Sequence, residues 1–497
     1  MCLVILLSLC GCQNEEEVPA AEQPTIPVVR IQLEEGAEGF EKINASEDHS
    51  YECAGDLTVI MPDGEKYQDL ELEYMRGRGN STWLAVKKPY KIKFEDKQDL
   101  FGLGANKHYV LLANAYDRTF LKNRLTFYIA DRMGMEYVPQ GVNVELYVND
   151  EYLGNYLFCE QVRVGKSRIE IDELSDETEV PDIWGGYLLS FSPWAEQEEE
   201  NIFRTSRDVA FYNDTPGYIP GDEDSGTDEQ KDYIREYIQR CEDAIFTEGG
   251  TEYEDLIDTV SAADYWLIQE LCQNADAFNT PSSYAYKKRF EDDGTEGKLY
   301  FGPLWDFDRA WGDTGFFSTD PAYFNHVTHK WINELRDKEE FAELLKERWK
   351  VLDQVLEELL KEGGAFDTWV LENEGSFSSD SAKWQDFYKE SDPDAGDDYV
   401  EYCKALKDWI NARRKWINEN IDDIGKILVR ITIRSDVQEE KTVKVEVSSF
   451  LFAQLEPEEA EGYVFEGWYD EEGNELPENA TADTDMIIYA RYRKNKN

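Results

Sequence analysis

The spacing of apolar residues changes partway along the chain, and this change restricts the fold more than any other feature. Over residues 28–171, apolar and polar residues mostly alternate, and turn dipeptides such as Asp63-Gly64 separate the runs. That pattern is typical of β-strands joined by tight turns. From about residue 227 onward, apolar residues recur at helical spacing. The sequence therefore predicts an α+β fold with two lobes, a β-rich N-terminal lobe and a helical C-terminal lobe, and a cleft between them.

Individual elements follow from the same patterns. Strands are expected over 56–61, 68–75, 90–94, 109–113 and 142–148. Helices are expected over 119–133, where Gly134 would cap the end, and over 228–246, 261–272, 338–360 and 401–424.

The last seventy or so residues return to a β pattern. The stretch GYVFEGWYDEEG opens a segment, Gly462 to Tyr492, that reads as strand, turn and strand. This segment resembles the small β-grasp-like repeat of Gram-positive surface proteins. The resemblance implies a small all-β domain that acts as a spacer or an adhesion module.

The charge balance limits the partners of the chain. Its net charge is −55 and its pI is about 4.3. Lys and Arg bind the phosphates of nucleic acids, so this large negative charge argues against a nucleic-acid partner. It also disfavours direct adsorption to anionic lipid, because like charges repel.

The N-terminus predicts export. An apolar run, MCLVILLSLC, is too short for a permanent membrane span and is followed by an acidic, proline-containing stretch. Cys12 follows Gly11 and resembles the lipidated cysteine of a bacterial lipobox. We expect lipidation at Cys12 and a location outside the cytoplasm, anchored to the cell membrane of a bacterium. The C-terminal resemblance implies that the bacterium is Gram-positive. An ordinary cleaved signal or anchor is the alternative.

A local reversal of charge lies in the stretches RGRGNSTW (76–83) and KKPYKIKF (87–94). Glycines allow backbone to approach a ligand closely, and successive amide groups in such turns attract anions. Arg76, Arg78, Lys88 and Lys91 would then surround a phosphate. A solvated basic edge strand explains the same pattern without a ligand.

Acidic residues sit in unusually apolar surroundings farther along. Asp306 and Asp308 lie in the nonapeptide GPLWDFDRA, and Asp276 and Asn279 follow a predicted helix. Metal-dependent phosphoryl transfer requires one carboxylate beside the acceptor hydroxyl and further Asp and Asn oxygens for Mg²⁺. The alternative is that these acids cap helices or pair with Arg309.

Six blocks of sequence in order together resemble one family. They are RGRGNSTW, KKPYKIKF, LLANAYDRTFLKN, LYVNDEYLGNYLFCEQV, IQELCQNADAF and GPLWDFDRAWG. The chain resembles the CotH family, the spore-coat-H-type atypical protein kinases. The resemblance implies a kinase-like domain that uses ATP with Mg²⁺ or Mn²⁺ to phosphorylate Ser or Thr of a protein partner. It divides the chain into a lipoprotein signal peptide (1–12), a linker (13–27), the CotH kinase-like domain (28–425) and the small β domain (426–497).

The resemblance also implies roles for single residues. Asp276 is the catalytic aspartate, Asp306 the metal-binding aspartate, and Asn279 and Asp308 are further metal ligands. The nucleotide-binding lysine is open among Lys88, Lys91 and Lys93. Strand direction favours Lys91, paired with Glu160 as the orienting acid.

Two other functions remain open from the sequence. The first is a surface protein without catalysis that binds a protein or polysaccharide through the same cleft. The second is a carbohydrate hydrolase that uses paired carboxylates.

Overall fold

We analysed a computed structural model of the chain. It describes residues 24–175, 178, 182–191, 202–215, 227–274, 276–278, 280, 282–312, 329–391, 396–426, 428–446, 455, 457–458, 460, 462–477, 480–482 and 486–495. The predicted lipidation site Cys12 and the predicted metal ligand Asn279 lie outside these residues.

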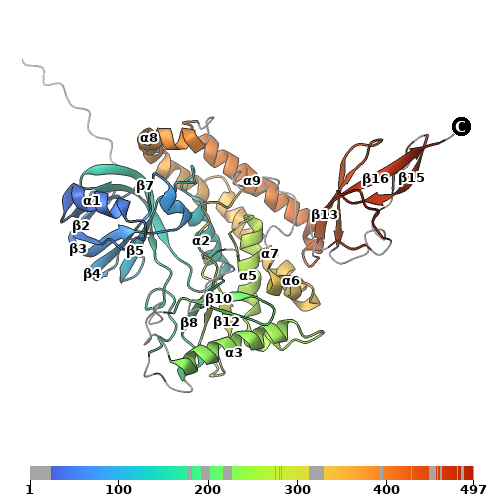
Figure 1. The fold of residues 1–497 in the computed structure, drawn as a ribbon. Helices are drawn as coiled ribbons and strands as arrows, with labels where there is room; N and C mark the ends of the chain where they lie inside the picture. The colour runs from blue at the N-terminus through green and yellow to red at the C-terminus, as the bar shows by residue number, and fades with distance from the viewer. Residues whose placement is uncertain are drawn as a thin grey trace, which may run out of the picture.

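The N-terminal part forms a closed barrel of strands in the order β1-β2-β3-β4-β5-β7-β6 (Figure 1). A parallel pairing of β1 with β6 closes it, and its other pairings are antiparallel. Alternate residues point inward, so Tyr90, Ile92 and Phe94 are all buried in the barrel core. The strands are β1 (Val28–Leu33), β2 (Cys53–Ile60), β3 (Lys66–Gly77), β4 (Tyr90–Gln98), β5 (Asn106–Leu112), β6 (Gly141–Val148) and β7 (Glu151–Glu160).

Two helices interrupt the barrel strands. The predicted one, α2, spans Lys122–Met133 and ends at Gly134, whose φ of +83° gives the left-handed cap that glycine favours. The other, α1 (Gly36–Ala45), was not predicted. It is short and contains two glycines, which weaken the helical signal in its sequence.

A second sheet, in the order β12-β11-β8-β10-β9, lies below the barrel in Figure 1. The sequence had predicted a helical lobe here and no sheet. One of its faces contributes to the largest apolar core, together with α3 and α5. Asp258 caps α5 by accepting from the backbone N–H of Ser261, the residue at which the sequence had placed the helix start. The elements are β8 (Tyr187–Phe191), β9 (Ile202–Arg204), β10 (Ala210–Asn213), β11 (Tyr284–Lys287), β12 (Leu299–Phe301), α3 (Asp228–Ile245), α4 (Tyr253–Leu256) and α5 (Thr259–Leu271).

Four more helices complete the C-terminal lobe. They are α6 (Lys330–Arg336), α7 (Glu339–Leu360), α8 (Ala365–Ser391) and α9 (Tyr399–Asn420). Helix α8 was not predicted; it packs against strand β7 of the barrel and so joins the two lobes. Short 3₁₀ turns occur at Ser81–Leu84, Asp182–Trp184 and Ile421–Asp423. Within the described ranges, no helix has the length and apolarity needed to cross a membrane.

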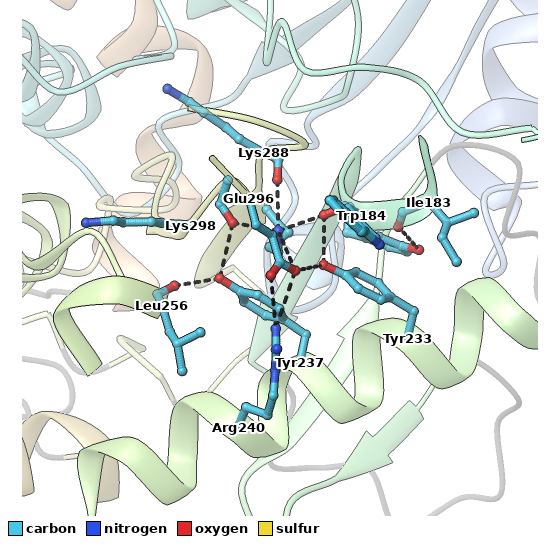
Figure 2. A network of polar contacts seen from close by, with 12 residues as sticks. Ile183, Trp184, Tyr233, Tyr237, Arg240, Leu256, Lys288, Glu296 and Lys298 are labelled. Carbon is cyan, nitrogen blue, oxygen red and sulfur yellow. Dashed lines mark hydrogen bonds and ion pairs between the residues drawn. The ribbon is translucent and has the colours of Figure 1, made fainter. Parts of the chain in front are cut away.

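The hairpin of β11 and β12 leads directly into the Asp306 segment, and a polar network fixes it to α3 (Figure 2). Tyr233 of α3 donates to Glu296 of the hairpin, and Tyr237 donates to the carbonyl of Leu256 at 2.8 Å. The fully buried ammonium of Lys287 donates to the carbonyls of Trp184 (2.7 Å) and Gly297 (2.6 Å). These contacts fix the hairpin, at Glu296 and Gly297, against α3.

The C-terminal residues form a sheet in the order β14-β13-β16-β15 with a small apolar core of its own. Figure 1 shows this sheet beyond the end of α9, apart from the barrel. Its strands are β13 (Leu428–Arg434), β14 (Lys441–Glu446), β15 (Tyr463–Tyr469) and β16 (Met486–Lys494). The α+β composition, with a β-rich first part and a helix-rich later part, is confirmed. The β-grasp likeness and the domain limits stay predictions.

Candidate functional site

A cavity of about 570 Å³ lies between the barrel and the C-terminal lobe. One side is formed by the glycine-rich turn from Arg78 to Thr82. The opposite side carries Asp276, Asp306 and Asp308. Segments about 200 positions apart in the sequence therefore meet at a cavity whose volume is typical of small-molecule sites.

The glycine-rich turn owes its shape to Gly79 and to Gly77, the last residue of β3. A Cβ added to Gly77 would lie 2.5 Å from Cη2 of Trp83, so only glycine lets that ring pack beneath the strand. Gly79 has a φ of +90°, and a Cβ there would collide with the Thr82 hydroxyl. The turn places Arg78 at the cavity, where its guanidinium lies 5.7 Å from the centre of the Trp305 ring.

Asp276 follows α5, at the place where the sequence predicted a loop. Its backbone N–H donates to the side-chain oxygen of Asn274 at 3.2 Å, and Asn274 also donates to the carbonyl of Asp306 at 3.4 Å. Asn274 thus ties together the two chain segments that carry the carboxylates. Asp306 itself has a φ of +71°, an uncommon conformation for a residue other than glycine, and accepts from Ser282 Oγ at 2.9 Å.

The start of α2 holds the Asp306–Asp308 segment from the other side. Asn123 accepts from the backbone N–H of Phe307 at 2.9 Å, and Lys122 Nζ donates to the carbonyl of Asp308 at 2.9 Å. Asp117 accepts from the backbone N–H of Lys122 at 2.9 Å, so it caps the helix. The start of α2 therefore also anchors the segment that carries two of the carboxylates.

Asn114 is a further polar residue of the cavity. It is buried, it has a φ of +51°, and it lines the cavity just after β5. Its side-chain Nδ2 has no hydrogen-bond partner within the part of the chain that the structure describes. A buried amide without a partner is costly, which suggests that a ligand supplies the missing acceptor.

The three carboxylates repel one another. Burial raises the pKa of Asp276, and the charge of Asp306 raises it further, while Arg309 opposes the shift. Burial also raises the pKa of Asp308 well above its usual value, with a further increase from Asp306 and an opposing effect of Lys122. A cation among these groups would relieve the repulsion.

The chemistry of the donors fits a hard divalent cation. Carboxylate oxygens are the ligands that Mg²⁺ and Mn²⁺ prefer. Among the residues that the structure describes, no three or more His, Cys, Asp or Glu side chains are grouped closely enough to hold a metal ion by themselves. Mg²⁺ commonly uses one or two carboxylates and completes its shell with phosphate and water oxygens, so Asp306 with Asp276 or Asp308 would suffice.

Other predicted binding residues lie outside the cavity. Arg76 forms an ion pair with Glu52 at 3.3 Å. Lys88 donates to the carbonyl of Trp83, and its ammonium lies 4.3 Å from the centre of the same ring. Lys91 is partly buried, and its pKa falls to about 8 because of burial first and then the nearby positive charges, Arg76 among them.

The predicted pairing of Lys91 with Glu160 is wrong. Glu160 instead forms a buried ion pair with Arg168 at 2.6 Å. In the barrel, Lys91 lies opposite Val110, whereas Glu160 lies opposite the neighbouring Tyr109. Successive residues of a strand point to opposite faces, so the lysine and the glutamate project on opposite sides of the sheet.

A comparison with protein families gives a match to the CotH kinase protein family over residues 75–417, which is more than half of the 497 residues. A comparison with curated proteins gave no match. The matched range includes the glycine-rich turn, the start of α2 and all three carboxylates of the cavity. On this evidence, the chain belongs to the CotH kinase protein family.

Proposed function

We propose that the chain is an exported, lipid-anchored phosphotransferase that moves the γ-phosphoryl group of ATP to a Ser or Thr hydroxyl of a protein. One observation carries the proposal. A single cavity gathers the cationic, glycine-bearing turn and the carboxylates Asp276, Asp306 and Asp308. Membership of a kinase-like family supports the same reaction class.

The cavity offers distinct surroundings for the two ends of a nucleotide. Leu112, Trp305 and Tyr284 give it an apolar and aromatic wall that fits a purine base. The turn from Arg78 to Thr82 presents a guanidinium and backbone amides, which fit phosphate oxygens. The unpartnered amide of Asn114 is a further donor for the same ligand.

In the proposed reaction, the acceptor hydroxyl oxygen forms a bond to the γ-phosphorus while the bond from that phosphorus to the bridging oxygen breaks, and ADP leaves. Asp276 orients the hydroxyl and takes its proton. Arg78 holds the phosphates in place. Asp306 and Asp308 would hold Mg²⁺ or Mn²⁺, which neutralises charge on the phosphates when it is bound.

The hydrogen bonds around Asp306 suit this chemistry. Asn274 and Ser282 fix Asp306, and Asn123 fixes the next backbone N–H, so the carboxylates are held before substrate arrives. Preorganised groups cost little reorganisation during reaction.

The test is transfer from γ-labelled ATP with Mg²⁺ or Mn²⁺ to the protein itself or to casein. We expect transfer by the unmodified chain and loss of at least about 100-fold in Asp276→Ala and in Asp306→Ala, because each removes a group that acts directly on the reaction. Asp292→Asn, in the exposed hairpin turn, serves as the matched control and is expected to retain transfer. Transfer that persists in both cavity variants would refute these roles.

Export and anchoring are tested separately. The proposal places Cys12 as the lipidated residue, on the sequence of the N-terminal segment alone. Expression in a bacterium fed a radiolabelled fatty acid should label the chain, and Cys12→Ser should abolish the label. Equal labelling of Cys12→Ser would reject this anchor.

A further inference from the structure

Buried and exposed side chains alternate in the segment that follows the glycine-rich turn. Trp83, Ala85 and Lys87 are buried. Between them, Leu84 is 85% exposed and Val86 is 60% exposed. Two large apolar side chains therefore project into solvent within three positions, which is unusual for a chain rich in charged residues.

The exposure does not come from a loose loop. The Trp83 ring packs beneath Gly77 and meets the His49 ring edge to face, with 4.8 Å between ring centres. The ammonium of Lys87 is fully buried and donates to the carbonyl of Asn155 at 2.9 Å. The buried residues hold the segment on both sides of Leu84 and Val86, so the two side chains are displayed from a fixed backbone.

One member of the pair, Leu84, lies beside the rim of the candidate catalytic cavity, which Ser81 helps to form. Leu84 is the last residue of the 3₁₀ turn that begins at Ser81. In such a turn, residues three apart lie one above the other, so Leu84 lies on the same edge as Ser81. Ser81 lines the cavity, as do its neighbours Asn80 and Thr82.

Resting on the function proposed above, we infer that Leu84 and Val86 form a docking contact for the protein acceptor. The contact would take an apolar side chain close in sequence to the Ser or Thr that is phosphorylated. The acceptor hydroxyl must enter the cavity to reach Asp276, so the polypeptide that carries it passes over this rim. The pair is then continuous with the path of the acceptor.

Charge and rigidity favour a polypeptide over a lipid surface. Although Arg78 and Lys88 lie close to the pair in sequence, the chain as a whole has a net charge of −55, which opposes close approach to an anionic membrane. Side chains on a fixed backbone lose little freedom when they are covered, so even a small contact contributes to affinity. Partial burial of two such side chains corresponds to about a 3- to 10-fold preference between acceptors.

The experiment compares two synthetic peptides of equal length with one central serine. One has leucine two positions from the serine, and the other has glutamine there. We expect the unmodified chain to show a kcat/KM about 3- to 10-fold higher for the leucine peptide, through KM rather than kcat. The double variant Leu84→Ser/Val86→Ser should lose this preference.

Leu371→Ser is the matched control, because Leu371 is 69% exposed on α8. It should keep the preference. Equal use of the two peptides by the unmodified chain, or a preference that survives in the double variant, would overturn the inference, as would a matching rise in the KM for ATP. Absence of all transfer would instead count against the proposed function.

Sedimentation with vesicles of phosphatidylcholine, with and without phosphatidylglycerol, tests whether Leu84 and Val86 contact a membrane instead of a polypeptide. The inference predicts that the chain without residues 1–23 sediments equally little with both kinds of vesicle. Sedimentation that the double variant abolishes would assign the pair to a membrane and overturn the inference.

Discussion

Replacing Lys87 by methionine tests how the segment after the glycine-rich turn is held against α8. The ammonium of Lys87 pairs with Asp380 of α8, and neither side chain is exposed to solvent. Asp380 also accepts from the backbone N–H of Asn155 at 2.9 Å and from the Tyr388 hydroxyl at 2.7 Å. Gly154 leaves the space for this carboxylate, because a Cβ there would collide with it.

The expected loss of stability follows from what the substitution leaves behind. Methionine is similar in length to lysine and fills most of the same volume, so packing changes little. Asp380 keeps two neutral hydrogen bonds and loses its ion pair with Lys87. Leaving one charge of a buried pair uncompensated costs about 3–5 kcal/mol, and we expect the free energy of unfolding to fall by that amount.

Urea unfolding followed by tryptophan fluorescence measures the loss. Lys383→Met is the matched control, because Lys383 also links α8 to β7, through Glu151, but both side chains are partly exposed. That substitution should cost about 0–1 kcal/mol. In Lys87→Met/Asp380→Asn the stranded charge is removed, so the double variant should be more stable than the sum of the single losses predicts. Equal losses in Lys87→Met and Lys383→Met would refute the reasoning.

Three further outcomes are expected. Gly77→Ala should lower the melting temperature, because the added Cβ would lie 2.5 Å from the Trp83 ring. Gly375→Ala is the control: it lies in a helix, the nearest atom to its added Cβ would be 3.8 Å away, and the melting temperature should stay unchanged or rise. In the folded chain the pKa of Lys91 is about 8, below its value of 10.5 without the fold, so the folded state loses the proton first and stability should rise between pH 8 and pH 10.5. Lys91→Met should remove that rise in urea titrations at several pH values; an unchanged pH dependence would show that Lys91 is well solvated. Arg78→Gln should raise the KM for ATP by about tenfold, whereas Arg76→Gln, which is paired with Glu52 away from the cavity, should not; equal effects would contradict the placement of Arg78.

Much of the barrel was predictable, because alternation of apolar residues directly reflects a sheet with one buried face. Strands β2 to β6 lie where the pattern placed them, and α2 ends at the predicted Gly134. The second sheet was less visible. Its strands β9, β10 and β11 have three or four residues each, too few for alternation to be recognised.

Helix α8 escaped prediction for a physical reason. Its inner face buries Asn373, Ser376 and Asp380 rather than a continuous apolar stripe. The amide of Asn155 donates to Asn373 at 2.9 Å and to Ser376 at 3.0 Å. Each of these polar side chains has a partner in the barrel lobe, and such pairing is not encoded in the helix sequence alone.

Part of the candidate site was also predictable from the sequence, and part was not. Order along the chain and residue type singled out Arg78, Asp276, Asp306 and Asp308, and the structure brings these four to one cavity. The assignment of Glu160 failed because the face on which a side chain projects depends on strand register. The role of Asn114 depends on a side-chain amide without a hydrogen-bond partner among the described residues, which only the three-dimensional arrangement reveals.

The most direct test of the account is a crystal structure of the chain with Mn²⁺ and a non-hydrolysable ATP analogue, in which the anomalous signal locates the metal. We predict a manganese peak about 2.1 Å from a carboxylate oxygen of Asp306 and from phosphate oxygens, with Arg78 against the phosphates. A nucleotide bound elsewhere, or a metal peak away from Asp306 while the nucleotide is in place, would contradict the central claim that this cavity is the phosphotransfer site.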